Sequence, residues 1–231
     1  MSYNTVMSVA DGIIMAADRR SCHFVEKVDG IIYSTAQSNT VKKLFLIGDN
    51  IGIGTGGYTA PMLDIHLEHL SRDATFKNPM EAAQNILDYF NINEKNKKNP
   101  VEIFVTGYDK SKQYEKSKYF PGTTNYLNPI PETYYINTAE NEISLWQNYG
   151  FVYRGCNSHF DTYKDKINSI IKKSNNYYTL QDAVDVSKFA FDISRKIDRY
   201  FYFVDNMSID MDMIVITPYE AKWLIKRELE A

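Results

Sequence analysis

Few side chains in this sequence have the type and spacing that catalysis or metal binding requires. His66 and His69, with Glu68 beside them, are the nearest approach to a metal site. A histidine pair three residues apart on a helix face is more often exposed, and no third ligand presents itself, so we expect no metal. The two cysteines, Cys22 and Cys156, lie far apart in the sequence. They indicate no disulfide framework, and a reducing cytoplasm suits them best.

Two adjacent lysines and a pair of glycines are the other candidates. Lys42 and Lys43 follow a polar segment and precede an apolar run. On a strand, neighbouring side chains point to opposite faces, so only one of the two lysines can face a given cleft. Gly56 and Gly57 form a turn before a helical segment. A glycine there would offer its backbone N–H with no side chain in the way of a substrate.

The elements that must position these residues are strands first and helices later. The Asp11–Gly12 turn separates two short apolar runs, which is typical of a β-hairpin. Apolar positions then recur at helical spacing, with Asn78 before Pro79 as a helix start and Thr179 with Asp182 as a capping pattern. Predicted strands cover residues 5–9, 13–17, 31–33, 44–47, 51–53, 101–106, 132–137, 142–146, 150–153 and 211–217. Predicted helices cover residues 58–71, 79–93, 158–173, 179–200 and 221–230.

Blocks of strands separated by pairs of helices predict an α+β layered domain rather than a βαβ nucleotide-binding sheet. The 231 residues suit one domain spanning 1–231, with a polar, Tyr-rich loop insertion at about 110–131. The net charge of −3 suggests neither nucleic-acid nor anionic-membrane binding. Apolar runs are only strand-sized, and the N-terminus lacks a signal-peptide pattern, so we expect no membrane segment.

Several motifs, taken in order, resemble those of proteasome β-subunits and HslV, which are N-terminal-nucleophile (Ntn) hydrolases. The opening hairpin Asp11 to Arg20 follows the pattern D-G-apolar-apolar-apolar-A-x-D-x-R. The further matches are Val41-Lys42-Lys43-Leu44, Gly54-Thr55-Gly56-Gly57, Arg154 to Ser158, and Asp205-Asn206-Met207-Ser208 followed by the strand Asp212 to Thr217. The resemblance implies a four-layer αββα sandwich. It also implies hydrolysis of peptide bonds by a free N-terminal Thr or Ser.

The resemblance assigns the nucleophile to Ser2, which becomes N-terminal when Met1 is removed. A hydroxyl needs a nearby base, and the chain's own α-amino group, with a pKa near 8, can serve. Lys43 would lower the pKa of the amine electrostatically, and Asp18 would hold the Lys43 ammonium in place. The alternatives are a frayed N-terminus, a solvated lysine and a turn aspartate.

The remaining catalytic assignments by resemblance are Gly57, Asp205 and Ser208. Gly57 would bind the oxyanion through its backbone N–H. The alternative is that Gly57 is only a turn glycine before a helix. Asp205 and Ser208 would support the amine and its water network, or else be a loop aspartate and a capping serine.

Two residues are weaker candidates for the site. Thr5 is a rival nucleophile that requires processing after Asn4, but it fits better inside the first strand. Cys156 stands where the family usually has Ser, and a thiol is a poorer hydrogen-bond partner than a hydroxyl. Arg20 matches a family arginine, for which we expect a structural role.

The resemblance implies a cytoplasmic homo-oligomer, in rings or stacks, that acts on peptide or unfolded protein. An ATP-dependent unfoldase is a further partner it suggests, and no cofactor is needed. Two other functions remain open: a catalytically inactive structural or interaction subunit with the same fold, and an Ntn amidohydrolase that cleaves a small amide. Fold alone does not decide between them.

Overall fold

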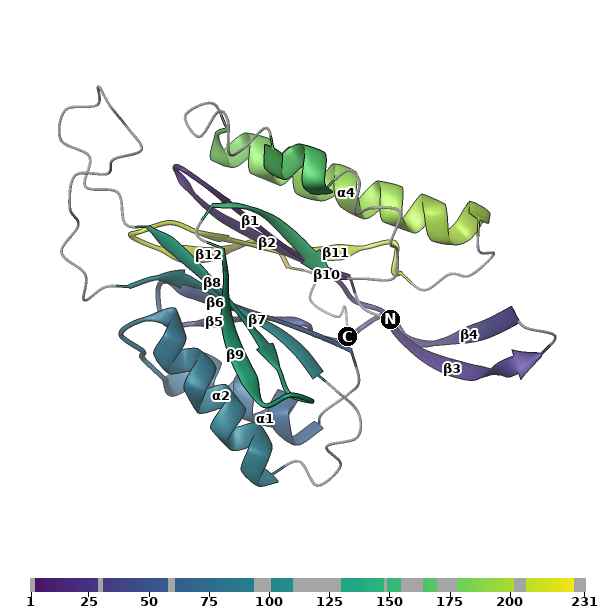
Figure 1. Ribbon diagram of the computed structural model, residues 1–231, viewed down its shortest axis with the longest axis horizontal. Helices are drawn as coiled ribbons and strands as arrows, with labels where there is room; N and C mark the ends of the chain where they lie inside the picture. Colours follow the sequence, from purple (N-terminus) through teal and green to yellow (C-terminus); the bar gives the residue numbers. More distant parts are fainter. Residues whose placement is uncertain are drawn as a thin grey trace.

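The structure, a computed structural model, describes residues 3–28, 31–57, 61–93, 101–109, 130–147, 149–154, 164–169, 178–201 and 207–226. Its core is a pair of five-stranded antiparallel sheets (Figure 1). The first sheet has the order β10-β1-β2-β11-β12, with β1 (Asn4–Val9), β2 (Gly12–Asp18), β10 (Gly150–Arg154), β11 (Met211–Ile216) and β12 (Ala221–Ile225). The second runs β5-β6-β7-β8-β9, with β5 (Leu44–Ile47), β6 (Ile51–Gly57), β7 (Val101–Tyr108), β8 (Pro131–Asn137) and β9 (Glu142–Gln147).

A two-stranded ribbon and a few helices complete the described elements. The ribbon consists of β3 (Ser21–Val28) and β4 (Ile31–Ser38) and extends away from the sheets (Figure 1). The helices are α1 (Pro61–Asp73), α2 (Pro79–Asn93) and α4 (Leu180–Phe201), and residues 164–169 are also helical. Helix α4 packs on β1 and β2, whereas α1 packs on β5 and α2 on β7 and β8.

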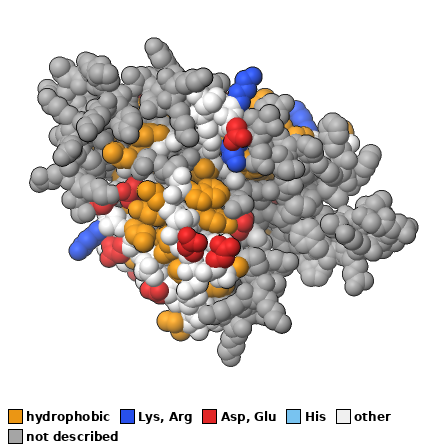
Figure 2. Space-filling model, in the orientation of Figure 1, with side chains coloured by type: hydrophobic (Ala, Val, Ile, Leu, Met, Phe, Trp, Pro, Cys, Tyr) orange, Lys and Arg blue, Asp and Glu red, His pale blue; other side chains and the backbone are white. Residues whose placement is uncertain are grey.

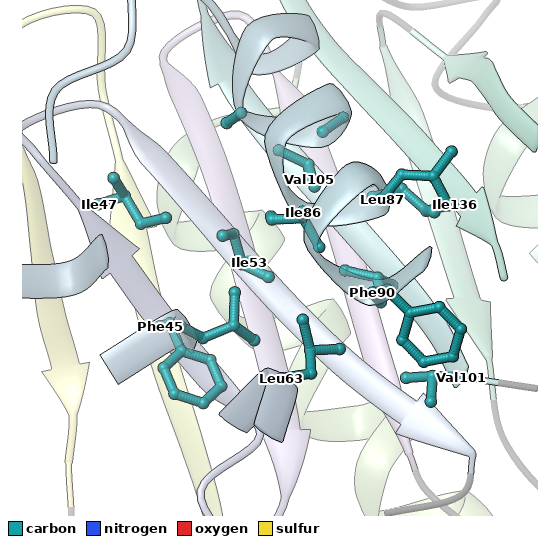
Figure 3. Packing of buried hydrophobic residues seen from close by; sticks show 14 of the residues in the cluster. Phe45, Ile47, Ile53, Leu63, Ile86, Leu87, Phe90, Val101, Val105 and Ile136 are labelled. Atoms are coloured by element: carbon teal, nitrogen blue, oxygen red, sulfur yellow. The ribbon is translucent and has the colours of Figure 1, made fainter. Parts of the chain in front are cut away.

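Three hydrophobic clusters hold these elements together. One lies between the first sheet and α4, a second between the second sheet and helices α1 and α2, and the third between the two sheets. Figure 3 shows the second cluster, in which Ile86 of α2 lies between Ile53 and Val105 of the sheet. Burial of such apolar surface is the main favourable term in folding. The sheets approach closely where Gly52 of β6 faces Met15 of β2. The approach requires glycine, since a Cβ at residue 52 would collide with the Met15 sulfur.

Both predicted helix starts are confirmed. The Asn78 side chain accepts a hydrogen bond from the Glu81 backbone N–H at 2.8 Å, and α2 begins at Pro79. Before α4, the Thr179 N–H donates to the Asp182 carboxylate at 2.7 Å, and the Asp182 N–H donates back to the Thr179 hydroxyl at 3.2 Å. This reciprocal pair satisfies N–H groups that a helix start leaves without partners.

The expected four-layer αββα sandwich is wrong. The described elements are twelve strands with few helices, so the fold is mainly β, built on two antiparallel sheets. One reason lies at residues 221–230, for which a helix was predicted. Residues 221–225 instead form strand β12, in which inward side chains alternate with the exposed Lys222 and Leu224. Pairing with β11 fixes that period of two.

Two further predictions fall largely outside the described residues. Of the loop expected at 110–131, only residues 130 and 131 are described, and Pro131 begins β8. Of the helix expected at 158–173, residues 164–169 are described and are helical.

Candidate active site

The centre of the candidate site is a buried ion pair between Lys43 and Asp18. The Lys43 Nζ atom lies 2.6 Å from Oδ1 of Asp18, and the two side chains are 6% and 0% exposed. The same ammonium donates to the backbone carbonyl of Arg20 at 2.6 Å. A charge without a partner at this depth would carry a large desolvation cost, so the pairing is what makes the burial possible.

The Asp18 carboxylate also accepts two backbone N–H groups. The Tyr3 N–H donates to Oδ1 at 2.8 Å, and the Arg20 N–H donates to Oδ2 at 2.9 Å. In return, the Asp18 N–H donates to the Tyr3 carbonyl at 3.1 Å. The carboxylate therefore fixes three things at once: the Lys43 ammonium, the turn after β2, and the first described residue of the chain.

The local sequence explains how residues 18 and 43 meet. Asp18 ends β2 and Lys43 directly precedes β5, and the β3–β4 ribbon occupies most of the intervening chain. The chain returns beside β2, where the Val41 N–H donates to the Arg19 carbonyl at 3.1 Å. Lys42 points elsewhere, to Glu68 of α1 at 2.7 Å. Only one of the adjacent lysines reaches the site, although both lie before β5 and not on a strand.

Gly57 lies at the exposed end of β6, close in the sheet to Lys43. The Thr55 N–H donates to the Lys43 carbonyl at 2.8 Å, which sets the position of β6 beside the ion pair. Two residues further on, Gly57 has a φ of 87°, a conformation that side-chain-bearing residues rarely adopt. An exposed backbone with no side chain is suited to close approach by a substrate.

Ser208 lies next to this centre but is already occupied by backbone groups. The Arg19 N–H donates to the Ser208 hydroxyl at 2.9 Å, and the hydroxyl donates to the Asp210 carbonyl. Ser208 is buried, and its contact with residue 19 places it one residue from Asp18. In this arrangement the hydroxyl holds the turn after β2, rather than presenting a free proton to a substrate.

The other predicted site residues are dispersed or lie outside the described part. Ser2, Asp205 and Cys156 are outside the described residues. Thr5 lies within β1, buried, with its hydroxyl 3.4 Å from the Ala16 carbonyl. Arg20, for which a structural role was expected, is buried, and its Nε donates to Asn39 Oδ1 at 2.7 Å.

Helix α1, which carries His66, Glu68 and His69, shows no metal-binding arrangement of these side chains. The His66 ring stacks on Tyr89 with centroids 3.7 Å apart and lies 3.0 Å from Asn85 Oδ1, while Glu68 binds Lys42. Over the described ranges, no group of three or more His, Cys, Asp or Glu side chains is placed to hold a metal ion.

Sequence reasoning missed Tyr3 and Asn4, which lie directly beside the ion pair. The backbone of Tyr3 contacts Asp18, and its ring is 1% exposed. The Asn4 side chain donates to the Thr55 carbonyl at 2.6 Å, a bond that ties the first sheet to the second. The only sequence signal was their position just after the proposed nucleophile, because neither residue type carries a motif of its own.

Comparison with known proteins shows a likeness of fold. The chain matches no protein family profile and no curated protein sequence. A mutant of Anbu from Hyphomicrobium sp. strain MC1 superposes with a TM-score of 0.60 at 14% identity, covering 98% of this chain and 86% of that one. Anbu from Yersinia bercovieri, described as an ancestral beta-subunit, gives a TM-score of 0.60 at 14% identity, covering 97% of this chain and 87% of that one.

These findings correct the resemblance to proteasome β-subunits and HslV drawn from the motifs. What is similar is the fold of Anbu, a relative of the proteasome β-subunits, and at 14% identity the likeness is one of fold alone. Membership of the proteasome β-subunit and HslV family is not supported. What the comparisons define is therefore the fold: this chain is similar in structure to Anbu, described as an ancestral beta-subunit. Separately, no described helix is long and apolar enough to cross a membrane.

Proposed function

We propose that this chain is a peptidase subunit that hydrolyses peptide bonds with Ser2 as an N-terminal nucleophile, exposed by removal of Met1. The observation that carries the proposal is the buried Lys43–Asp18 pair at the start of β1. The nitrogen that donates to Asp18 belongs to Tyr3, and it is bonded directly to the carbonyl carbon of Ser2. The ammonium and the proposed nucleophile are thus linked through one carboxylate oxygen.

The pair would act on the Ser2 amine. A nearby ammonium favours the uncharged form of an amine, so Lys43 would keep the Ser2 α-amino group deprotonated at neutral pH. The neutral amine takes the hydroxyl proton as the Ser2 oxygen attacks the substrate carbonyl carbon. The amine then gives this proton to the departing amine of the substrate. Water hydrolyses the resulting ester, which releases the second product and restores the hydroxyl.

Gly57 would supply the oxyanion donor. Gly57 is exposed, has a positive φ and no side chain, and ends strand β6, which is tied to Lys43 through Thr55. Removal of one such donor typically costs ~10²–10³-fold in rate. Ser208 would act by fixing the backbone of Arg19, the residue that follows Asp18. Asp205 and Cys156 remain proposed members of the site.

We further propose that the whole of 1–231 forms one domain that assembles as a homo-oligomer. Strand β9 is an edge of the second sheet, and it exposes Leu145 and Trp146 at 52% and 37%. Figure 2 shows hydrophobic side chains gathered over the β8–β9 region, with acidic side chains beside them. An apolar edge strand pairs readily with another chain, so proteins usually cover it. The occupant proposed here is a second copy of the chain.

The test of the function is peptide hydrolysis by untagged protein, compared with its Ser2→Ala variant. We expect turnover of an unfolded protein or fluorogenic peptide by the wild type and none by Ser2→Ala. Turnover that survives Ser2→Ala would refute the assignment. Cleavage of small amides but not peptides would favour the amidohydrolase alternative, and a folded protein inactive on both would favour the structural subunit.

A further inference from the structure

Tyr3 joins the candidate site to the hydrophobic core through both its backbone and its side chain. Its N–H donates to Oδ1 of Asp18 at 2.8 Å, the same oxygen that binds the Lys43 ammonium at 2.6 Å. Its carbonyl accepts the Asp18 N–H at 3.1 Å. These two bonds fix the position of the Tyr3 backbone relative to the Asp18–Lys43 pair.

The ring of Tyr3 points to the other side of the sheet, under α4. It is 1% exposed and meets Phe191 edge to face, with ring centroids 5.5 Å apart and an interplanar angle of 78°. Met7, Phe151 and Tyr153 belong to the same buried cluster. Aromatic pairs in this geometry stabilise beyond the area they bury. The first described residue of the chain is therefore one of the most deeply buried.

The position uses the ring and not the hydroxyl. A buried tyrosine O–H usually finds a hydrogen-bond partner, but the Tyr3 hydroxyl has none of normal geometry among the described residues. Burial raises the pKa of the Tyr3 phenol well above 10.0, and the nearby Thr5 side chain offsets the rise only in part. A phenylalanine would therefore satisfy every packing contact of this site.

Chain ends ordinarily fray unless they are tied down, and a reacting group misplaced by 1 Å can cost ~10²-fold in rate. We propose that Tyr3 is a positioning residue whose buried ring anchors the start of β1, so that the amine and hydroxyl of the preceding residue are held against the Asp18–Lys43 pair. This inference rests on the proposed function of Ser2. It adds that the nucleophile is placed by a packing contact from helix α4, and not by the polar network alone.

The test compares Tyr3→Ala, the conservative Tyr3→Phe, and Phe90→Ala as a matched control. Phe90 is 2% exposed but belongs to the cluster on the far side of the second sheet. For Tyr3→Ala we expect a fall in kcat of ~10²-fold, a KM within a few-fold of wild type, and a shifted pH–rate profile. Tyr3→Phe should restore kcat to within about twofold of wild type. Phe90→Ala should lower the melting temperature comparably and leave kcat and the pH–rate profile unchanged.

Three results would overturn the proposal: a folded Tyr3→Ala with wild-type kcat, an equal loss in Tyr3→Phe, or an equal loss in Phe90→Ala. Should Tyr3→Ala fail to fold, Tyr3→Leu keeps an apolar side chain without the ring, and the same expectations apply to it. A loss of kcat in Tyr3→Phe would show that the Tyr3 hydroxyl, and not the ring, is needed. A loss of kcat in Phe90→Ala would show that kcat follows general stability.

A second measurement separates this proposal from the proposed function. Hydrogen exchange of the residue 3 amide should be slow in wild type and Tyr3→Phe, and at least about tenfold faster in the Ala variant, with the Val6 amide as internal reference. If the wild type hydrolyses nothing, the proposed function fails. The exchange rates of the residue 3 amide then test by themselves whether the Tyr3 ring anchors the start of β1. Equal protection in wild type and the Ala variant would overturn the anchor whatever the activity.

Discussion

The Lys43 Nζ atom lies 2.6 Å from Oδ1 of Asp18, in a pair whose side chains are almost wholly removed from solvent. Lys43→Ala would leave the Asp18 carboxylate buried without its cation. We expect the free energy of unfolding to fall by about 3–5 kcal/mol and peptidase activity to disappear, as measured by denaturant unfolding and peptide turnover. Lys42→Ala is the control: its pair with Glu68 is about one-third exposed, so the change should stay below about 1 kcal/mol, with activity kept.

A double variant separates stability from chemistry at the same pair. Asp18→Asn with Lys43→Met removes both charges and should recover much of the stability lost in Lys43→Ala, because no unpaired charge remains. The protein should nevertheless stay inactive, since no ammonium remains to lower the pKa of the amine. Wild-type turnover by the folded double variant would sink the proposed role of Lys43.

Gly57 has a positive φ of 87°, and Gly48, in the turn between β5 and β6, has a φ of 56°. Alanine at either position should cost about 1–2 kcal/mol of stability from left-handed strain. Only Gly57→Ala should also reduce kcat, by ~10²-fold, because relief of the strain would turn the oxyanion donor away. Equal activities for the two alanine variants would argue against Gly57 as that donor.

Asn4 bridges the two sheets through its bond to the Thr55 carbonyl at 2.6 Å. Asn4→Ala would leave that buried carbonyl without this donor, so we expect a loss of about 1–3 kcal/mol and a lower kcat from a looser cleft. Asn93, which donates to the Tyr89 carbonyl at 3.0 Å at the end of α2, is the matched control. Asn93→Ala should lower stability less than Asn4→Ala and leave activity unchanged. Larger losses in Asn93→Ala than in Asn4→Ala would contradict the role of Asn4 as a bridge between the sheets.

Tyr3 should make stability fall at alkaline pH. The folded protein keeps the phenol proton because burial raises its pKa well above 10.0, whereas the unfolded chain loses it near that value. Below about pH 10 both states hold the proton and there is no effect; above it the unfolded state gains, by about 1.4 kcal/mol for each pH unit. Denaturant unfolding at about pH 8 and about pH 11 should therefore show a smaller decrease for Tyr3→Phe than for wild type. Equal decreases would show that this phenol does not titrate differently on unfolding.

Elements with a local signal were predicted well from the sequence. The Asp11–Gly12 turn predicted the β1–β2 hairpin, and Asn78 before Pro79 predicted the start of α2. The segment 221–225 failed because its backbone is decided by pairing with β11, which a short mixed sequence does not reveal. The four-layer prediction, which came from the family resemblance, failed as well, since the described elements are mainly strands in two antiparallel sheets.

The candidate site divides in the same way. Asp18 and Lys43 stand in motifs and could be predicted to meet, as the structure shows. Tyr3 and Asn4 could not, because their roles depend on partners far along the chain, Phe191 of α4 and Thr55 of β6. Contacts of this kind arise from packing and leave no periodicity in the sequence.

The most direct test of the central claim is the intact mass of the untagged protein before and after an epoxyketone, which needs both a hydroxyl and a free N-terminal amine. We expect a mass lacking Met1 that gains one inhibitor, with the adduct on Ser2 and absent from Lys43→Ala. A folded protein that retains Met1 and gains no adduct would show that Ser2 is not an N-terminal nucleophile.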